Sequence, residues 1–401
     1  MNPRRLAVAL IVSAQWLGTS LWFSPNSAAD DLMAAWSIRP AQFAWLIAAT
    51  QAGFITGTLW LAYSGWADRY PTSCVFATAC VTGALFNGAF SSALIGFESG
   101  VVLRFAVGVC LAGIYPLGMK MIVGWVGGKS GAALGLLVGM LTLGTALPHG
   151  VRALGATLPW QAVIQVSSAL ALAGAALVYF LGDGPHLKRS DARKGASLGR
   201  AFAVFRIPDF RAAAMGYFGH MWELYAFWAV LPWLAGQLLM DAGQSQWGEF
   251  GSVAAISFFC IAAGFLGCVC GGRVSLRLDS TYVAAFALLA SGVLCLIYPL
   301  LPRDWLLLRF LVLFAWGFFV IADSPQFSSI SARSCPPEWV GSALAIQNSI
   351  GFLITIVSIT LLLSVIDELG SKALWILLPG PILGLTGMSP LLKKTRNGGA
   401  R

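Results

Sequence analysis

Long apolar runs separated by short polar or charged stretches dominate the chain. A transmembrane helix needs about 20 mostly apolar residues to cross the hydrocarbon core of a bilayer. On that criterion the sequence predicts twelve spans: 6–24, 42–62, 73–95, 99–125, 131–153, 159–181, 210–235, 249–271, 281–301, 305–327, 340–366 and 373–392. The first run follows a basic N-terminus, as a secretory signal would, but it has no clear cleavage site. We therefore expect it to be the first span.

The composition excludes most classes of soluble protein. Hydrophobic residues make up 58% of the 401 residues and charged residues only 10%, against about 25% charged in a typical soluble chain. So little charge could not cover a soluble surface, which excludes a soluble enzyme, a nucleic-acid binder and a disordered protein. The chain also has no Gly-x4-Gly-Lys-Ser/Thr loop, so we do not expect it to be an ATP-driven pump. No cofactor is expected.

The eight cysteines do not suggest a disulfide scaffold or a metal site. All but Cys335 lie inside apolar runs, and Cys268 and Cys270 form the only close pair. Residues two apart on a helix point to different sides. We expect buried free thiols.

Basic residues lie mainly on one side of the predicted spans. If both termini are cytoplasmic, all but seven of the 25 Lys and Arg residues fall in inside segments. The seven are Arg39, Arg104, Lys120, Arg152, Arg303, Arg309 and Lys372. This bias matches the positive-inside rule and predicts an inner or plasma membrane protein with both ends in the cytoplasm. The basic stretch 183–208 is the one long inside connection, and we expect it to lie along anionic headgroups. It divides the chain into bundles at 1–182 and 209–401.

The two halves resemble each other. Trp16 and Trp22 recur as Trp222 and Trp228, Leu103-Arg104-Phe105 recurs as Leu308-Arg309-Phe310, and the small-residue run from Gly131 recurs from Gly341. The three matches occur in the same order at nearly the same offset. Two six-helix repeats are a recurrent plan of secondary transporters, in which the solute site lies between the halves.

Twelve spans divided six and six by a basic loop resemble the major facilitator superfamily over the whole chain. Ala67-Asp68-Arg69 is similar to the centre of the family's signature loop, although Ser64 and Pro71 stand where that loop has Gly. Arg104 to Gly108 is similar to its Arg-x-x-x-Gly pattern. On span 5, Pro148-His149-Gly150 resembles the family's exporter motif with a different order of Gly and Pro. The resemblance implies an all-α membrane fold of two pseudo-symmetric six-helix bundles, with spans 1, 4, 7 and 10 around a central cavity.

Ionisable residues inside those four spans are candidates for function, because a charge in hydrocarbon costs several kcal/mol. At about 1.5 Å per residue, Glu223 lies roughly 20 Å along span 7 from Asp209, near mid-depth. His220 is on the same helical face. A desolvated Glu could bind a proton, and the alternative is a permanently ionised Glu paired with an Arg. His220 could equally be an ordinary hydrogen-bonded interior His.

Arg104 and Arg309 occupy equivalent positions of the repeat. Two guanidiniums could clamp a carboxylate or another oxyanion; alternatively, each pairs with an acid or faces water. Gln15, Trp16, Trp222 and Tyr225 could add cavity polarity and stacking, although membrane aromatics are more often packing residues or interface anchors. We assign gate roles to Asp68, Arg69, Lys120, Arg277 and Asp323, with Lys120 and Asp323 expected near the cytoplasmic helix ends.

Glycines recur four apart at Gly53 and Gly57 on span 2, at Gly131, Gly135 and Gly139 on span 5, and at Gly267 and Gly271 on span 8. Such spacing permits close helix approach. The resemblance implies that spans 2 and 8 meet spans 11 and 5 of the other half, so we expect these glycines at the sliding seam.

The sequence therefore predicts a secondary transporter, coupled to protons by symport or antiport, that moves a small solute by alternating access, and an anion is one candidate for that solute. The alternative within the class is a drug/proton antiporter, and the alternative outside it is a membrane receptor or scaffold without transport. We expect a monomer whose partners are the solute, protons and the lipid bilayer, with no nucleic acid.

Overall fold

The computed structural model of the chain is all-helical across the residues it describes, which are 3–92, 94–126, 131–155, 158–187, 202–242, 252–336 and 339–398. The helices of the described residues make up twelve membrane segments, six in each of two bundles, which confirms the predicted fold class. Within the same residues, eight helices are long and apolar enough to cross a membrane by length and composition alone. The chain divides into two compact units, Met1–Gly195 and Ala196–Arg401.

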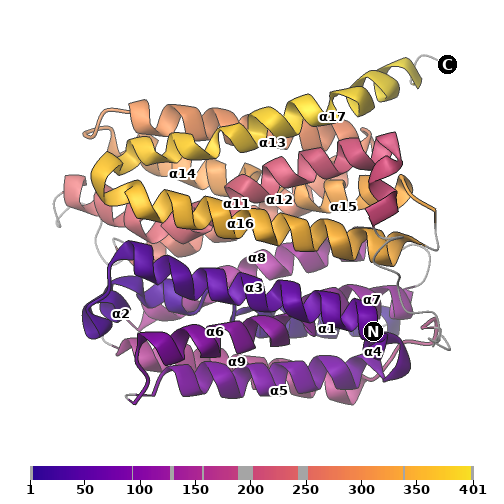
Figure 1. Ribbon diagram of the computed structural model, residues 1–401, viewed down its shortest axis with the longest axis horizontal. Coiled ribbons are helices and arrows are strands. Elements are labelled where there is room, and N and C mark those ends of the chain that lie inside the picture. The colour runs from indigo at the N-terminus through magenta and orange to yellow at the C-terminus, as the bar shows by residue number, and fades with distance from the viewer. Residues whose placement is uncertain are drawn as a thin grey trace. The chain divides into compact units, whose positions relative to one another are not determined.

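The N-terminal unit is built from pairs of long helices that lie side by side (Figure 1). In it α3 packs against α6, α5 against α9, and α1 against α8 and α9. The elements are α1 (Pro3–Thr19), η1 (Pro25–Ala28), α2 (Ala29–Trp36), α3 (Pro40–Ser64), α4 (Trp66–Arg69), α5 (Thr72–Phe90), α6 (Phe97–Ala112), α7 (Tyr115–Val126), α8 (Gly131–Leu154) and α9 (Trp160–Leu181).

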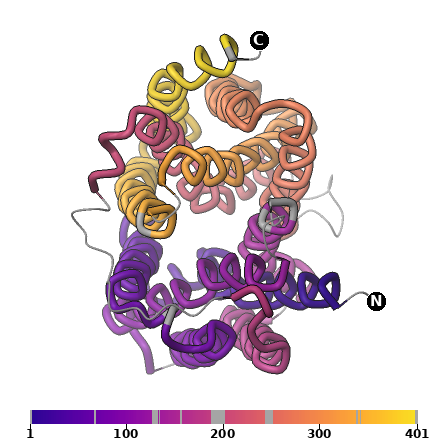
Figure 2. The backbone as a smooth tube through the Cα atoms, turned by 90° about the vertical axis from the view of Figure 1, so that its right-hand side faces the viewer, coloured from indigo at the N-terminus to yellow at the C-terminus, as the bar shows by residue number. Residues whose placement is uncertain are grey.

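The C-terminal unit has the same kind of pairing, seen roughly along the helix axes in Figure 2. Here α11 packs against α16 and α17, and α12 packs against α14. The elements are η2 (Val204–Arg206), α11 (Pro208–Ala242), α12 (Val253–Val274), α13 (Ser280–Ile297), η4 (Tyr298–Leu300), α14 (Leu306–Phe319), α15 (Ser324–Arg333), α16 (Val340–Leu369), η6 (Gly370–Leu377) and α17 (Pro379–Gly398).

Spans 4 and 10 are each broken in two, where the sequence predicted continuous helices. The break separates α6 from α7 in one unit and α14 from α15 in the other. Each break comes just before a proline, Pro116 or Pro325, which has no N–H and whose ring clashes with the carbonyl four residues earlier. Span 10 also continues to Arg333 rather than ending at 327, because Pro325 lies in the first turn of a new helix, where proline is tolerated. We had expected Asp323 near the cytoplasmic end of the span, but it lies at the break.

The paired glycines of spans 2 and 8 bring helices together within each unit. A methyl group at Gly53 would overlap the carbonyl oxygen of Phe105 on α6, and one at Gly267 would overlap that of Phe318 on α14. The expectation that these glycines serve the seam between the halves was wrong. Their missing side chains let the α3–α6 and α12–α14 backbones touch, and this contact holds the broken spans against their neighbours.

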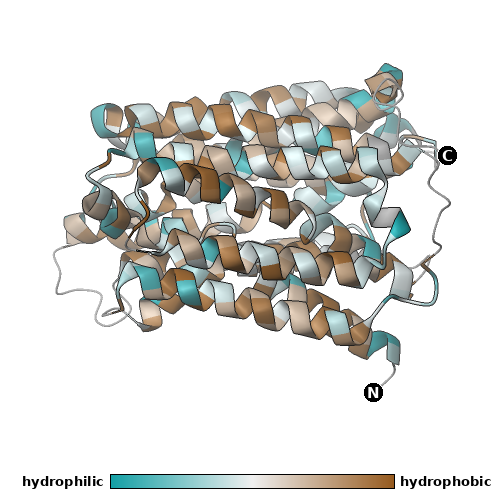
Figure 3. Cartoon of the chain, turned by 60° about the horizontal axis from the view of Figure 1, so that its bottom comes forward, coloured by the Kyte–Doolittle hydropathy of each residue, from teal (hydrophilic) through white to brown (hydrophobic). Residues whose placement is uncertain are grey.

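The outward faces of the helices are apolar. Large hydrophobic side chains are exposed along the helices, among them Leu85, Phe180, Phe286 and Leu307. Brown, hydrophobic residues run the length of the helices, and teal, hydrophilic residues are frequent at their ends and in the loops (Figure 3). A surface of this kind suits lipid tails as its solvent.

Candidate functional site

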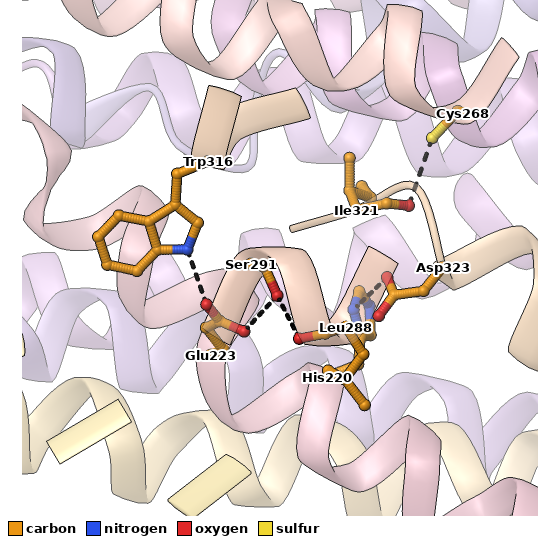
Figure 4. Close-up of polar contacts among 8 residues, drawn as sticks. All are labelled: His220, Glu223, Cys268, Leu288, Ser291, Trp316, Ile321 and Asp323. Carbon is orange, nitrogen blue, oxygen red and sulfur yellow. Dashed lines mark hydrogen bonds and ion pairs between the residues drawn. The ribbon is translucent and has the colours of Figure 1, made fainter. Parts of the chain in front are cut away.

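Glu223 is the centre of a buried polar cluster inside the C-terminal unit (Figure 4). Its side chain lies on α11 and has no exposed area. The indole N–H of Trp316, on α14, donates to one carboxyl oxygen at 2.7 Å, and the hydroxyl of Ser291, on α13, donates to the other at 2.9 Å. Among the described residues no Lys or Arg forms an ion pair with Glu223. The carboxyl group is thus held by two neutral donors rather than by a cation.

His220 lies one helical turn before Glu223 and faces a different acid. Its ring Nδ1 is 2.8 Å from a carboxyl oxygen of Asp323, and both side chains are almost completely buried. Asp323 sits at the break of span 10, directly before α15. The structure therefore brings the two candidate residues of span 7 together with Asp323 (Figure 4), the residue that we had placed in the gate.

The break in span 10 is stabilised by a neighbouring helix. Pro325 has no N–H to donate to the carbonyl oxygen of Ile321, its acceptor in a regular helix, and this oxygen accepts the backbone N–H of Ser324 at 3.1 Å instead. The thiol of Cys268, on α12, donates to that oxygen at 3.6 Å (Figure 4). Cys268 is buried whereas Cys270 is exposed. The two cysteines point to different sides of α12, and one of them has a structural role.

Arg104 is held by neutral acceptors deep inside the N-terminal unit. Its guanidinium donates to the hydroxyl of Thr50 at 3.1 Å and to the amide oxygen of Asn87 at 2.9 Å. It also donates to the backbone oxygens of Leu21 and Trp22 at 3.0 and 2.6 Å. These carbonyls follow the last turn of α1, so Arg104 fastens the end of span 1 to spans 2, 3 and 4.

Arg309 has a different environment, although it is the repeat equivalent of Arg104. It donates to Asp241, at the end of α11, at 2.6 Å, and to the backbone oxygen of Arg303 at 3.2 Å. Its guanidinium carbon also lies 5.6 Å from the centre of the Tyr298 ring. Each of the two arginines is thus engaged within its own unit.

Of the other residues proposed for solute contact, two have contacts with neighbouring side chains or backbone, and two have polar groups without a hydrogen-bond partner among the described residues. Trp222 donates to the backbone oxygen of Ile376 at 2.9 Å, and the Tyr225 ring packs 5.1 Å from Trp228 and Phe352. Gln15 is buried next to Gly118, and neither atom of its amide has a hydrogen-bond partner among the described residues. The indole N–H of Trp16 is likewise without one. The polar groups of Gln15 and Trp16 are thus unpaired within the described part of the chain.

The proposed gate residues are mostly at helix ends. Arg69 closes α4 and is exposed, Arg277 is exposed in the turn after α12, and Lys120 is half-buried on α7. The side chain of Asp68 lies outside the described residues. Sequence reasoning missed a further acid in this region: the carboxyl oxygens of Asp183 accept the backbone N–H groups of Thr72 and Ser73 at 3.1 and 2.8 Å. Asp183 thus caps the N-terminus of α5 directly after the signature-like loop.

Sequence reasoning also missed the partners of the buried charges. Ser291, Trp316 and Asn87 carry no charge, so a search for ionisable residues in apolar helices passed over them. Repeat symmetry gave no signal either, because the equivalent residues Arg104 and Arg309 have different partners. Pro116 and Pro325, in contrast, were visible signals of the two breaks.

A family model and a solved structure each match most of the chain. The sequence model described as Major Facilitator Superfamily matches residues 8–359. In structure the chain is similar to a mutant of the nucleoside transporter NupG in a crystal structure, with a TM-score of 0.73 and 13% sequence identity, over 96% of this chain and 99% of that one. At that identity the likeness shows the fold alone. The comparison with curated proteins found no match.

Proposed function

The chain belongs to the Major Facilitator Superfamily, and from this premise we propose that it is a proton-coupled transporter in which Glu223 carries the proton. Family and fold make it a multi-pass membrane protein and a secondary transporter of small solutes, not an enzyme. Proton coupling, the solute and the roles of individual residues are parts of the proposal.

The observation that carries the proposal is the environment of Glu223. A carboxylate held permanently ionised in an apolar interior would need a cation beside it. Glu223 instead has two neutral donors, Ser291 and Trp316. The hydrogen bond from Trp316 favours the carboxylate, and complete burial of the side chain favours the neutral acid. The two tendencies oppose each other, so a change in wetting during alternating access can move the proton on or off.

The decisive experiment measures two activities of the Glu223→Gln variant: solute accumulation driven by a pH gradient, and solute exchange without a gradient. The solute must first be found, and a thermal-shift screen of the purified protein is the direct route. Glutamine resembles the protonated acid in shape and charge. The variant should therefore lose pH-driven accumulation in liposomes and keep solute exchange at equal pH on both sides.

The matched control is Glu368→Gln, because Glu368 is exposed at the end of α16. It should leave both activities unchanged. If Glu223→Gln transports with an unaltered dependence on the pH gradient, Glu223 is a structural group and the coupling proposal fails.

The solute is a less specific part of the proposal. Both arginines are engaged within their own units, so the geometry offers less support for an anion clamp than the sequence did. Gln15 and Trp16 have polar groups without a hydrogen-bond partner among the described residues, and such groups favour a small polar solute. The screen should contain nucleosides, which the NupG comparison suggests, together with small organic anions. Lipophilic cations belong in it too, because the drug/proton antiporter remains the alternative.

A further inference from the structure

The hydroxyl of Ser291 has two acceptors within reach and only one hydrogen. Its oxygen is 2.9 Å from a carboxyl oxygen of Glu223 and 3.1 Å from the backbone oxygen of Leu288, one turn back on α13 (Figure 4). A serine hydroxyl can donate one hydrogen bond and accept others. It can therefore donate to Glu223 or to Leu288, but not to both at once.

These two orientations match the two charge states of Glu223. When the carboxyl group is ionised, Ser291 donates to Oε2 while Trp316 donates to Oε1. When a proton binds at Oε2, that oxygen becomes a donor and the Ser291 oxygen its acceptor. The serine hydrogen then turns to the Leu288 carbonyl. Only hydrogens move, and in both states the Ser291 hydroxyl, the Trp316 indole and any proton on Glu223 each have an acceptor.

We propose that Ser291 is a two-way hydrogen-bond partner that lets Glu223 take up and release a proton without losing a hydrogen bond. The inference rests on the proposed function in taking Glu223 as the proton carrier. Ser291 is in this sense a positioning residue, since it acts through Glu223.

Trp316 has the opposite character, and the contrast makes the proposal specific. An indole N–H can only donate, so its bond to Oε1 is stronger when Glu223 is charged. Trp316 therefore favours the carboxylate, whereas Ser291 serves both states.

Other ionisable groups near Glu223 are already engaged. The His220–Asp323 pair faces it from α11 and from the break of span 10. Cys295, one turn further along α13, donates to the backbone oxygen of Leu374 at 3.2 Å. Among the described residues these groups leave Ser291 as the hydroxyl bonded to Glu223.

Infrared spectroscopy of the purified full-length protein during a pH titration tests the proposal without a solute. The band lost in Glu223→Gln identifies the protonated carboxyl group. In Ser291→Ala that group loses its acceptor, so its C=O band should move to higher wavenumber. The titration midpoint should rise by less than in Trp316→Phe, because both charge states lose one bond.

Trp316→Phe should raise the titration midpoint of Glu223 by about one unit or more, because in this variant only the carboxylate loses a strong bond. The control is Ser358→Ala, since Ser358 is buried on α16 and donates to its own helix at Thr355. It should alter neither band nor midpoint.

Three results would overturn the inference. They are an unchanged carboxyl band in Ser291→Ala, a midpoint that rises in Ser291→Ala as much as in Trp316→Phe, and a Glu223 that never titrates. Failure of the proposed function is distinct, because it appears in transport by Glu223→Gln. Glu223 could still titrate through Ser291 when transport is independent of the proton gradient.

Discussion

Arg104 and Arg309 show how equivalent positions in a repeat can acquire different roles. Arg104 meets four neutral oxygens and Arg309 meets a carboxylate. The planar fork of a guanidinium can serve several acceptors in fixed directions, whereas a lysine ammonium is a compact point charge with three donors. The two sites should therefore respond differently to the same conservative substitution.

We predict that Arg104→Lys destabilises the protein by about 2–3 kcal/mol, because buried acceptors around it lose their donors. Arg309→Lys should cost less, because an ammonium can still pair with Asp241. Thermal unfolding of the two purified variants makes the comparison. Equal losses in both variants would contradict the assignment of Arg104 as the residue that fastens span 1.

Asp279 links pH to stability at the start of α13. Its carboxyl oxygen accepts the backbone N–H of Thr281 at 2.8 Å. Burial acts to raise the pKa of Asp279, but the hydrogen bonds from Thr281 and the charge of Arg333 outweigh it, and the pKa lies below its usual 3.8. The fold therefore favours the carboxylate. Its contribution is complete above the usual pKa and is lost as the pH falls through the lowered one.

We accordingly predict that Asp279→Ala lowers stability by about 0.5–1 kcal/mol at pH 7, as for loss of an exposed helix cap. The difference from the original protein should shrink at about pH 3, where the original also loses its charged cap. Thermal midpoints at the two pH values measure this. Asp279→Asn should keep most of the neutral-pH stability, since Asn is a good cap. A difference for Asp279→Ala that is independent of pH would rule out the charged cap.

At the scale of elements, the glycine contacts decide how the broken helices are held. Gly267 and Gly272 lie on the same helix, α12, yet a methyl group would overlap the Phe318 carbonyl at the first and meet nothing within 4 Å at the second. Gly267→Ala should destabilise by about 1–3 kcal/mol through overpacking. Gly272→Ala should be neutral or slightly stabilising, because alanine has the better helix propensity. Chemical or thermal unfolding of both variants tests the contact, and a harmless Gly267→Ala would refute it.

At the scale of the whole molecule, the orientation in the membrane rests on the distribution of basic residues. We propose that both termini and the 183–208 segment are cytoplasmic in an inner or plasma membrane. In a background without the exposed thiols Cys74 and Cys270, an impermeant thiol reagent should miss Ala192→Cys in intact cells and label it after lysis. Arg303→Cys, in an expected outside loop, is the control and should react in intact cells. Labelling of position 192 from outside would reverse the topology.

The apolar runs alone determined the fold class, because only helices satisfy their own backbone hydrogen bonds in lipid. Glu223 and His220 were identifiable from the sequence as well, because an ionisable side chain inside a membrane span has a high free-energy cost and usually has a function. Tertiary structure decided the partners. Ser291, Trp316 and Asp323 reach the α11 residues from other helices, and the packing that brings them there depends on Gly267 and on the break before Pro325. Hydropathy reports which segments lie in the membrane, whereas the chemistry of a buried polar residue depends on which residues of other helices lie beside it.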